Sequence, residues 1–98
     1  MKIVWADSAK ADLNAIRAYI SRDSAYYASR VVGRIVEATK VLKRFPELGQ
    51  VVPEFADSTI RERHSQTYRI LYRVQSDHVL ILAVVHSSRD LTRLMLEH

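Results

Sequence analysis

The stretch IRERHSQTYRILYRVQSDHVLILAVVHSSRD, residues 60–90, decides the fold, because arginines alternate with apolar side chains at its centre. Successive residues of a β-strand face opposite sides. TYRILYRV, residues 67–74, therefore predicts a strand with one packed face and one charged face. Tyr72 falls on the packed face, whereas Arg69 and Arg73 fall on the charged one.

The apolar segment HVLILAVV, residues 78–85, is expected to return antiparallel to this strand through a two-residue turn at residues 76–77. In that register Arg69 lies opposite Val84. His86 then shares the side of the sheet that carries Arg69. The prediction is one surface on which a histidine and several arginines converge.

Size and composition indicate one globular domain. The chain has 98 residues, of which 48% are hydrophobic and 27% are charged, which suits a single core. We expect the domain to span residues 1–95. The closing residues 96–98, Leu-Glu-His, resemble the start of a vector-derived histidine tag and are left out of the functional argument.

The sequence offers no cofactor or metal motif. It has no cysteine and two glycines, Gly33 and Gly49, which cannot form a phosphate-binding loop. The spacing of His64, His78 and His86 is not that of a zinc site. No apolar run approaches the roughly 18 residues of a membrane span, so we expect no cofactor, no metal, no membrane and a cytoplasmic location.

The net charge of +4 favours a polyanion or an acidic protein as partner. A charged face kept only for solubility is the alternative. If the charged face serves only solubility, its arginines are expected to form ion pairs with Glu62 and Asp90. Such pairs contribute little to stability at a surface. The aromatic side chains elsewhere are expected to pack in the core rather than to stack on bases; they are Trp5, Tyr26, Tyr27 and Phe45.

The rest of the chain supplies a strand and two helices. Residues 2–5 predict a strand, and Asp7 or Ser8 is expected to cap a helix that runs to about Ser21. A second amphipathic helix is stopped by Pro46, and an ordered loop with room for a short edge strand follows. The fold class is α+β in the order β-α-α-β-β-β, with an N-terminal strand and an antiparallel two-helix hairpin packed on one face of a small antiparallel sheet.

This order of elements, together with three short motifs, resembles the RelE/ParE superfamily of bacterial toxins. The motifs are PELG at 46–49, YRILYR at 68–73 and VHSSR at 85–89, and the resemblance extends from Val4 to Leu91. It implies a small toxin that a cognate antitoxin, itself small, acidic and DNA-binding, neutralises. RelE-like members cleave messenger RNA on the ribosome, whereas ParE-like members, the plasmid-stabilisation branch, poison DNA gyrase.

RNA cleavage without a metal needs a base, an acid and a cation that stabilises the phosphorane. The resemblance implies that Arg61 and Arg63 match the basic pair of RelE-like toxins. It assigns Arg69 and Arg89 as further candidates. The tyrosine that these toxins carry near the C-terminus is absent, and His86 is the candidate to replace it as acid or base.

A histidine followed three residues later by an arginine, after an apolar last strand, favours the ParE-like branch. We therefore expect a gyrase poison, with a RelE-like mRNA endonuclease as the alternative. A degenerate toxin that only binds its antitoxin is a third possibility. The expected contact surface for the target is a basic face made of Arg61, Arg63, Arg69, Arg73, His86 and Arg89.

Overall fold

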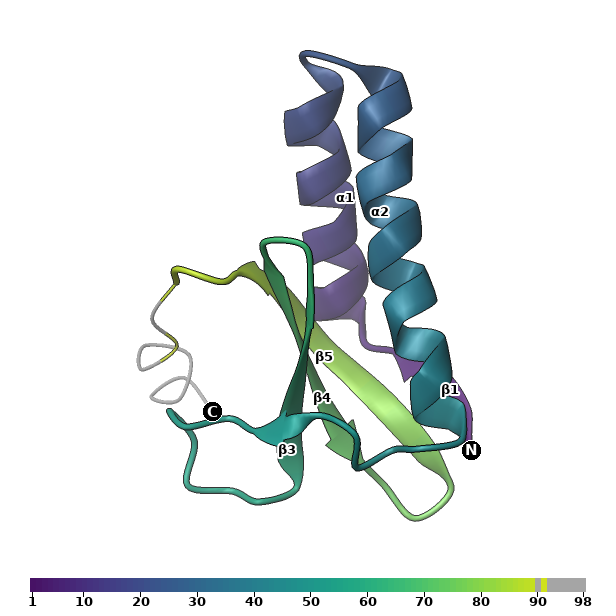
Figure 1. The fold of residues 1–98 in the computed structure, drawn as a ribbon, viewed down its shortest axis with the longest axis vertical. Coiled ribbons are helices and arrows are strands. Elements are labelled where there is room, and N and C mark those ends of the chain that lie inside the picture. The colour runs from purple at the N-terminus through teal and green to yellow at the C-terminus, as the bar shows by residue number, and fades with distance from the viewer. Residues whose placement is uncertain (90, 92–98) are drawn as a thin grey trace.

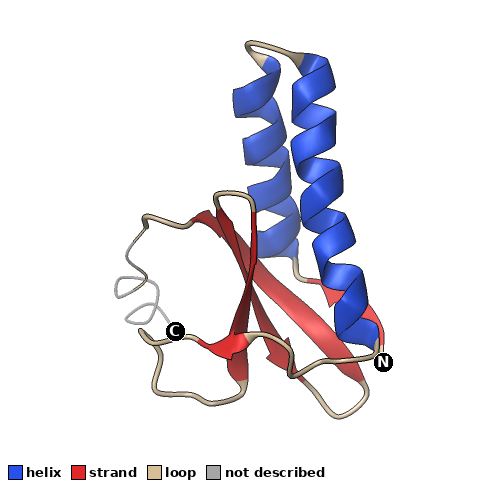
Figure 2. Ribbon diagram, in the orientation of Figure 1, coloured by secondary structure: helices blue, strands red, loops and turns tan. Residues whose placement is uncertain are grey.

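The computed structural model describes residues 1–89 and 91, which form a helical hairpin on one face of a five-stranded sheet (Figures 1 and 2). This confirms the α+β class and the expected order of elements. The expected tag remnant at residues 96–98 lies outside the described part. The elements are β1 Lys2–Trp5, α1 Asp7–Ser21, α2 Ala25–Lys40, the 3-10 helix η1 Val41–Lys43, β2 Gln50–Val51, β3 Ile60–Ser65, β4 Tyr68–Val74 and β5 His78–His86.

The sheet is mixed, with the strand order β1-β5-β4-β3-β2. Strand β1 pairs in parallel with β5, and the other neighbours are antiparallel. The sequence analysis expected a wholly antiparallel sheet. The difference arises because the first strand pairs with the last, and the helical hairpin carries the chain across one face between them. No described helix is long and apolar enough to cross a membrane.

The two helices begin differently. At the start of α2 the Ser24 hydroxyl accepts a hydrogen bond from the Tyr27 N–H at 3.1 Å, which satisfies one otherwise unpaired donor. No side chain caps α1, whose N-cap position is Ala6. The expected cap at Asp7 or Ser8 is therefore wrong, and the Ser8 hydroxyl instead donates to the Leu82 carbonyl oxygen at 2.7 Å.

The main core lies between the hairpin and the sheet. Tyr72 is fully buried there, as expected, among apolar side chains from both layers: Ala9, Val31, Ile35, Leu42, Ile70, Val79, Ile81 and Val84. Burial of each large apolar side chain stabilises the fold by about 1.5–3 kcal/mol. A second cluster lies on the opposite face of the sheet and contains Val52, Ile60, Leu71, Val85 and Leu91. That face, which we call the outer face, is therefore partly apolar rather than wholly charged.

A β-bulge changes the register between β4 and β5. Next to the turn the pairing is as expected, with Val74 opposite Val79. The register then shifts between Leu71 and Tyr72, and Leu82 has no opposed partner. Beyond this point every pair is one residue away from the expected register. A shift of one residue turns side chains to the other face.

The helical hairpin extends beyond the end of the sheet (Figure 1). Side chains near its tip have no second layer to pack against, and both Tyr26 and Tyr27 are exposed. Phe45 is exposed as well, whereas Trp5 packs against the main core. The expectation that these four aromatic residues pack in the core is therefore wrong for all but Trp5.

Candidate functional site

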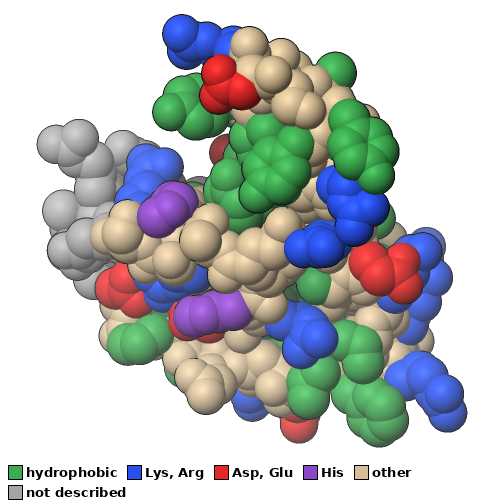
Figure 3. Space-filling model, turned by 45° about the horizontal axis from the view of Figure 1, so that its top comes forward, with side chains coloured by type: hydrophobic (Ala, Val, Ile, Leu, Met, Phe, Trp, Pro, Cys, Tyr) green, Lys and Arg blue, Asp and Glu red, His purple; other side chains and the backbone are tan. Residues whose placement is uncertain are grey.

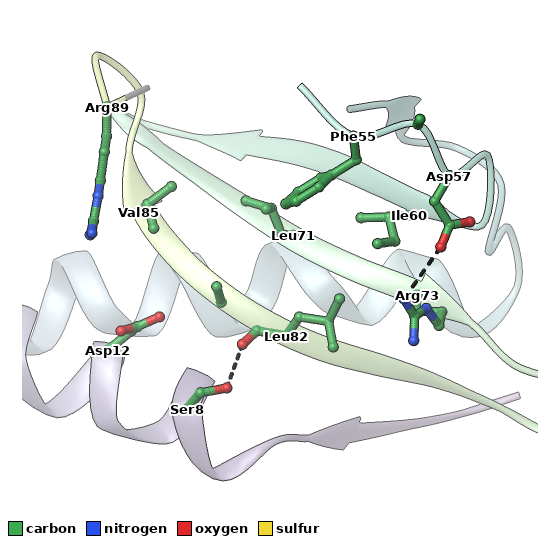
Figure 4. Close-up of a pocket in the computed structure, with 12 residues that line it drawn as sticks. Ser8, Asp12, Phe55, Asp57, Ile60, Leu71, Arg73, Leu82, Val85 and Arg89 are labelled. Carbon is green, nitrogen blue, oxygen red and sulfur yellow. Dashed lines mark hydrogen bonds and ion pairs between the residues drawn. The ribbon is translucent and has the colours of Figure 1, made fainter. Parts of the chain in front are cut away.

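A groove of about 780 Å³ runs along the outer face, as Figure 4 shows. Most of its lining is apolar and comes from the last strands and from the loop after β2: Phe55, Ala56, Ile60, Leu71, Leu82, Ala83 and Val85. Its polar lining consists of Ser8, Asp12, Asp57, Arg73 and Arg89. We call this feature the outer groove. An apolar cleft with a few polar groups is the usual form of a binding site.

Arginines stand at the two ends of the outer groove (Figure 4). Arg73 forms an ion pair with Asp57 at 3.4 Å, and both side chains are partly exposed. Its Nε atom is buried and has no hydrogen-bond partner among the described residues. Arg89 follows the end of β5 and is exposed. The groove therefore combines an apolar floor with cationic ends, and one end retains an unused donor.

Helix α1 forms one wall of the outer groove and supports the bulge. Strand β1 ends at Trp5, so the edge of β5 beyond Ile81 has no neighbouring strand. The Asp12 carboxylate there accepts a hydrogen bond from the Val84 N–H at 2.9 Å. Burial raises the pKa of Asp12, and the Val84 N–H and the charge of Arg89 oppose that rise. Side chains of α1 thus pair with backbone groups on the edge of β5 that has no neighbouring strand.

Beside the groove, two carboxylates enclose the guanidinium of Arg69, which is only 7% exposed. Its Nη1 and Nη2 donate to the Glu54 carboxylate, each at 2.9 Å. Its Nε donates to Glu62 at 3.1 Å, and Nη2 contacts the same carboxylate. The expected ion pair with Glu62 is therefore present, whereas Asp90 lies outside the described residues. Two carboxylates and one guanidinium leave this cluster without a free positive charge.

The ionisation of this cluster follows from its contacts. Hydrogen bonds from Arg69 lower the pKa of Glu54 to about 2. Hydrogen bonds to Glu54 in turn raise the pKa of Arg69 above its usual value. His64 Nε2 lies 3.0 Å from the second carboxylate, that of Glu62. Arg69 and Glu54 thus hold each other ionised, and the Glu62 carboxylate lies against the same guanidinium.

The Arg69 cluster also joins three segments of the chain. Glu54 belongs to the loop between β2 and β3, and Glu62 belongs to β3. Arg69 Nη1 donates to the Arg89 carbonyl oxygen at 3.3 Å, and the Leu91 N–H donates to Glu54 at 3.2 Å. The cluster therefore positions the loop over the outer groove and fixes the chain beyond β5.

Three of the six expected site residues lie on the helix side of the sheet, so the expected single basic face is wrong. Arg61 pairs opposite the core residue Tyr72, and its guanidinium donates to the Gly49 carbonyl oxygen at 2.8 Å. Arg63 donates from Nε to the Ala38 carbonyl oxygen of α2 at 2.8 Å. Strand parity places both arginines away from Arg69, which projects from the outer face.

His86 is the third of these residues, and the bulge is the cause. It pairs opposite Tyr68, whereas Arg69 pairs opposite Val85. The rings of His86 and Tyr68 meet edge to face with centroids 6.0 Å apart. His86 is exposed, and its Nδ1 accepts a hydrogen bond from the Ser88 N–H at 3.2 Å.

The sequence analysis missed the residues that complete the site. Glu54 and Phe55 come from an irregular loop, and Asp12 comes from a helix far away in the sequence. No local pattern indicates that these residues meet the arginine strand; the acidic residues of the loop were the only available signal. Among residues 1–89 and 91, no group of three or more potential ligand side chains is arranged to hold a metal ion.

Solved structures of toxin–antitoxin systems share this fold. The chain matches the chromosomal ParDE system of P. aeruginosa with a TM-score of 0.72 and 26% identity, over 88% of this chain and 95% of that one. It matches the RelBE2 toxin–antitoxin complex of Mycobacterium tuberculosis with a TM-score of 0.64 and 25% identity, over 87% and 95%. The helical hairpin on a mixed sheet is thus a fold that this chain shares with toxins of toxin–antitoxin systems.

Sequence comparisons agree with the structural ones. The toxin RelE2 of Caulobacter vibrioides is 36% identical over 89 residues, which are 90% of this chain and 97% of that protein. Residues 3–91 match the family described as the ParE toxin of the type II toxin–antitoxin system parDE, and the chain belongs to this family. The expected membership of the RelE/ParE superfamily is confirmed.

Proposed function

We propose that this toxin arrests bacterial growth by poisoning DNA gyrase in the cytoplasm. The observation that carries the proposal is the state of Arg69, which the alternative mechanism would need as the cation facing the scissile phosphate. Its guanidinium is buried and engaged with Glu54 and Glu62. An anionic phosphorane would meet two carboxylates at this point, which disfavours RNA cleavage there.

The other groups that RNA cleavage requires do not converge on Arg69. His86 lies on the opposite face of the sheet. Tyr72 is the last tyrosine of the chain, and its hydroxyl is buried and accepts a hydrogen bond from the Gly49 N–H at 2.8 Å. Burial raises the pKa of Tyr72, which makes the phenol a poorer acid. A poison that acts by binding needs none of these groups.

We propose the outer groove as the surface that contacts gyrase. Arg73 and Arg89 are the two residues of the expected basic face that remain accessible on this side. Phe55 and Leu71 supply apolar area between them. Arginine beside aromatic and aliphatic side chains is the composition of strongly contributing residues in protein interfaces.

A cognate antitoxin is the second partner, and we propose that it covers the same groove. An apolar segment with acidic side chains at both ends would complement the floor and the two arginines. Neutralisation would then follow because the antitoxin and gyrase compete for one surface.

The test compares two reactions. Purified toxin is incubated with gyrase, ATP and relaxed plasmid in the first, and with translating ribosomes and a defined message in the second, each with and without antitoxin. We expect trapped cleaved plasmid that the antitoxin abolishes, and an intact message. Cleavage of the message at the ribosomal A site would instead establish the RelE-like endonuclease, and inactivity in both reactions would favour a toxin that only binds its antitoxin.

A further inference from the structure

The outer groove has an acidic side chain beside each of its two arginines. Its charged lining consists of Arg73 and Asp57 at one end and of Arg89 and Asp12 at the other (Figure 4). The formal charges of these four residues sum to zero. A polyanion such as a nucleic acid binds to a surplus of cations, which this lining lacks. The groove therefore suits a protein segment with isolated carboxylates better than a nucleic acid.

The pair at one end of the groove is accessible and loosely made. Arg73 Nη2 donates to Asp57 Oδ2 at 3.4 Å. The Arg73 and Asp57 side chains are 39% and 41% exposed, so a partner can reach both of them. The contact is long and joins one nitrogen to one oxygen, whereas an arginine can bind a carboxylate through two parallel hydrogen bonds. A carboxylate of a partner can therefore form a better pair with Arg73 than Asp57 does.

The other oxygen of Asp57 is bound within its own loop. Asp57 Oδ1 accepts hydrogen bonds from the Thr59 N–H at 2.9 Å and from the Thr59 hydroxyl at 2.6 Å. These bonds lower the pKa of Asp57 and keep the carboxylate ionised at neutral pH. They also fix the position of the carboxylate, so the loop itself holds Oδ2 against Arg73. The pair is thus a consequence of the loop geometry and does not require a strong attraction.

Neighbouring charges of opposite sign also occur elsewhere on the molecule. Figure 3 shows acidic side chains beside basic ones on the face that it presents, and Lys40 pairs with Glu37 on the surface of α2. Such pairs contribute little to stability. The pair of Arg73 and Asp57 differs from these because both residues line the outer groove. A protein that binds in the groove must therefore cover or replace this pair.

We propose that Asp57 is an internal competitor, whose Oδ2 occupies on Arg73 the place that a carboxylate of the partner protein takes in the complex. The inference rests on the proposed function, because the partner is the gyrase that the outer groove contacts. Asp57 then determines specificity: a partner gains the arginine only if one of its own carboxylates lies where it can displace Asp57. A protein without an acidic group at this point leaves the internal pair intact and gains only the apolar contacts.

Asp57→Asn separates the two contacts of this side chain. The amide oxygen can still accept both hydrogen bonds from Thr59, whereas the amide nitrogen cannot pair with Arg73. In the reaction with gyrase, ATP and relaxed plasmid, we expect this variant to trap cleaved plasmid at about two- to fivefold lower toxin concentration, because an exposed ion pair shifts an equilibrium by about this factor. Glu47→Gln removes one negative charge at an exposed position outside the groove and should behave as the parent. In an Arg73→Gln background, Asp57→Asn should have no effect.

A second measurement tests the internal pair in the free toxin, without gyrase. Phenylglyoxal modifies accessible guanidinium groups, and mass spectrometry locates the modified arginines. We expect Asp57→Asn to raise the modification rate of Arg73 at least about twofold, since the exposed pair no longer protects it. The rate for Arg69, which is buried, should not change. Thermal unfolding of each variant checks that the fold is intact.

Several results would overturn the inference: an unchanged modification rate of Arg73, a gain in trapping that persists in the Arg73→Gln background, or an equal gain in Glu47→Gln. Weaker trapping by Asp57→Asn would overturn it as well and would show that Asp57 orients Arg73 for the target. Trapping by the parent without a gain in Asp57→Asn overturns this inference alone. A faster reaction of Arg73 in a protein that traps no cleaved plasmid overturns the proposed function alone.

Discussion

The hydroxyl of Tyr72 accepts a hydrogen bond from the backbone N–H of Gly49 at 2.8 Å, in the protein interior. This contact attaches the loop after η1 to the centre of β4. A Cβ atom at position 49 would lie 2.6 Å from the Tyr72 hydroxyl oxygen and would also contact the Glu62 carbonyl oxygen. Position 49 therefore requires glycine because of close approach, since its φ is not positive.

Replacement of this glycine should destabilise the fold. We expect Gly49→Ala to lower the free energy of unfolding by about 1–3 kcal/mol, because the methyl group forces Tyr72 from its position. Gly33 is the matched control: it lies within α2 and has no atom within 4 Å of the place of a Cβ, so Gly33→Ala should stabilise the fold by about 0.5–1 kcal/mol. Urea denaturation measures both changes, and equal effects would contradict this account.

Removal of the Arg69 side chain should unfold much of the population. Arg69→Ala leaves Glu54 and Glu62 facing each other without their cation, which costs about 3–5 kcal/mol of stability. The loss of stability is expected to be smaller in a triple variant, in which Arg69 is replaced by alanine and both Glu54 and Glu62 are replaced by glutamine. Chemical denaturation of the single and triple variants tests this, and a fully stable Arg69→Ala would show that the cluster contributes nothing. Lost toxicity in Arg69→Ala would report on folding rather than on target contact.

The lowered pKa of Glu54 predicts how stability changes with acid. Its pKa falls from 4.5 to about 2 on folding. The ionised carboxylate therefore stabilises the fold above pH 4.5, and this contribution is lost as the pH falls towards 2. Glu54→Gln should be less stable than the parent at pH 7 and approach it in acid. The free energy of unfolding, measured from pH 7 to pH 2, tests this prediction, and Glu47→Gln at an exposed position is the control. A stability difference between Glu54→Gln and the parent protein that stays constant with pH would contradict it.

The two arginines of the outer groove should govern toxicity without governing the fold. Both side chains are partly or fully exposed, so the Arg73→Gln/Arg89→Ala double variant should fold normally. We expect at least about tenfold more of it to be needed for half-maximal gyrase trapping, which corresponds to about 1.4 kcal/mol of binding energy. Lys10→Ala, an exposed change on α1, should behave as the parent protein. Full activity of the double variant would refute the groove as the contact surface.

Local sequence patterns predicted the elements well because each has a physical signature of its own. The strand at residues 2–5 and the end of α1 at Ser21 match the structure. The buried position of Tyr72 follows from alternation in a strand whose two faces differ in chemistry. The chain after Gly49 also forms the short edge strand β2, for which the sequence analysis left room.

The arrangement of the site was harder to predict because it depends on long-range pairing. The segment from Val79 to Val85 is apolar at every position, so alternation says nothing about which residue faces which side. The bulge at Leu82 therefore gives no signal in the sequence. The predicted register, which lacks the bulge, placed His86 on the wrong face of the sheet. The loop that brings Glu54 over Arg69 is irregular, and no periodicity foretells where an irregular loop folds back.

The bulge in β5 decides which face of the sheet the end of this strand presents. Because of the extra residue, each side chain of β5 after Leu82 faces the side of the sheet opposite to the one that strict alternation would give. The pairs next to the turn keep their register. A single inserted or deleted residue in this strand would thus exchange His86 with its neighbour, without a change to either side chain.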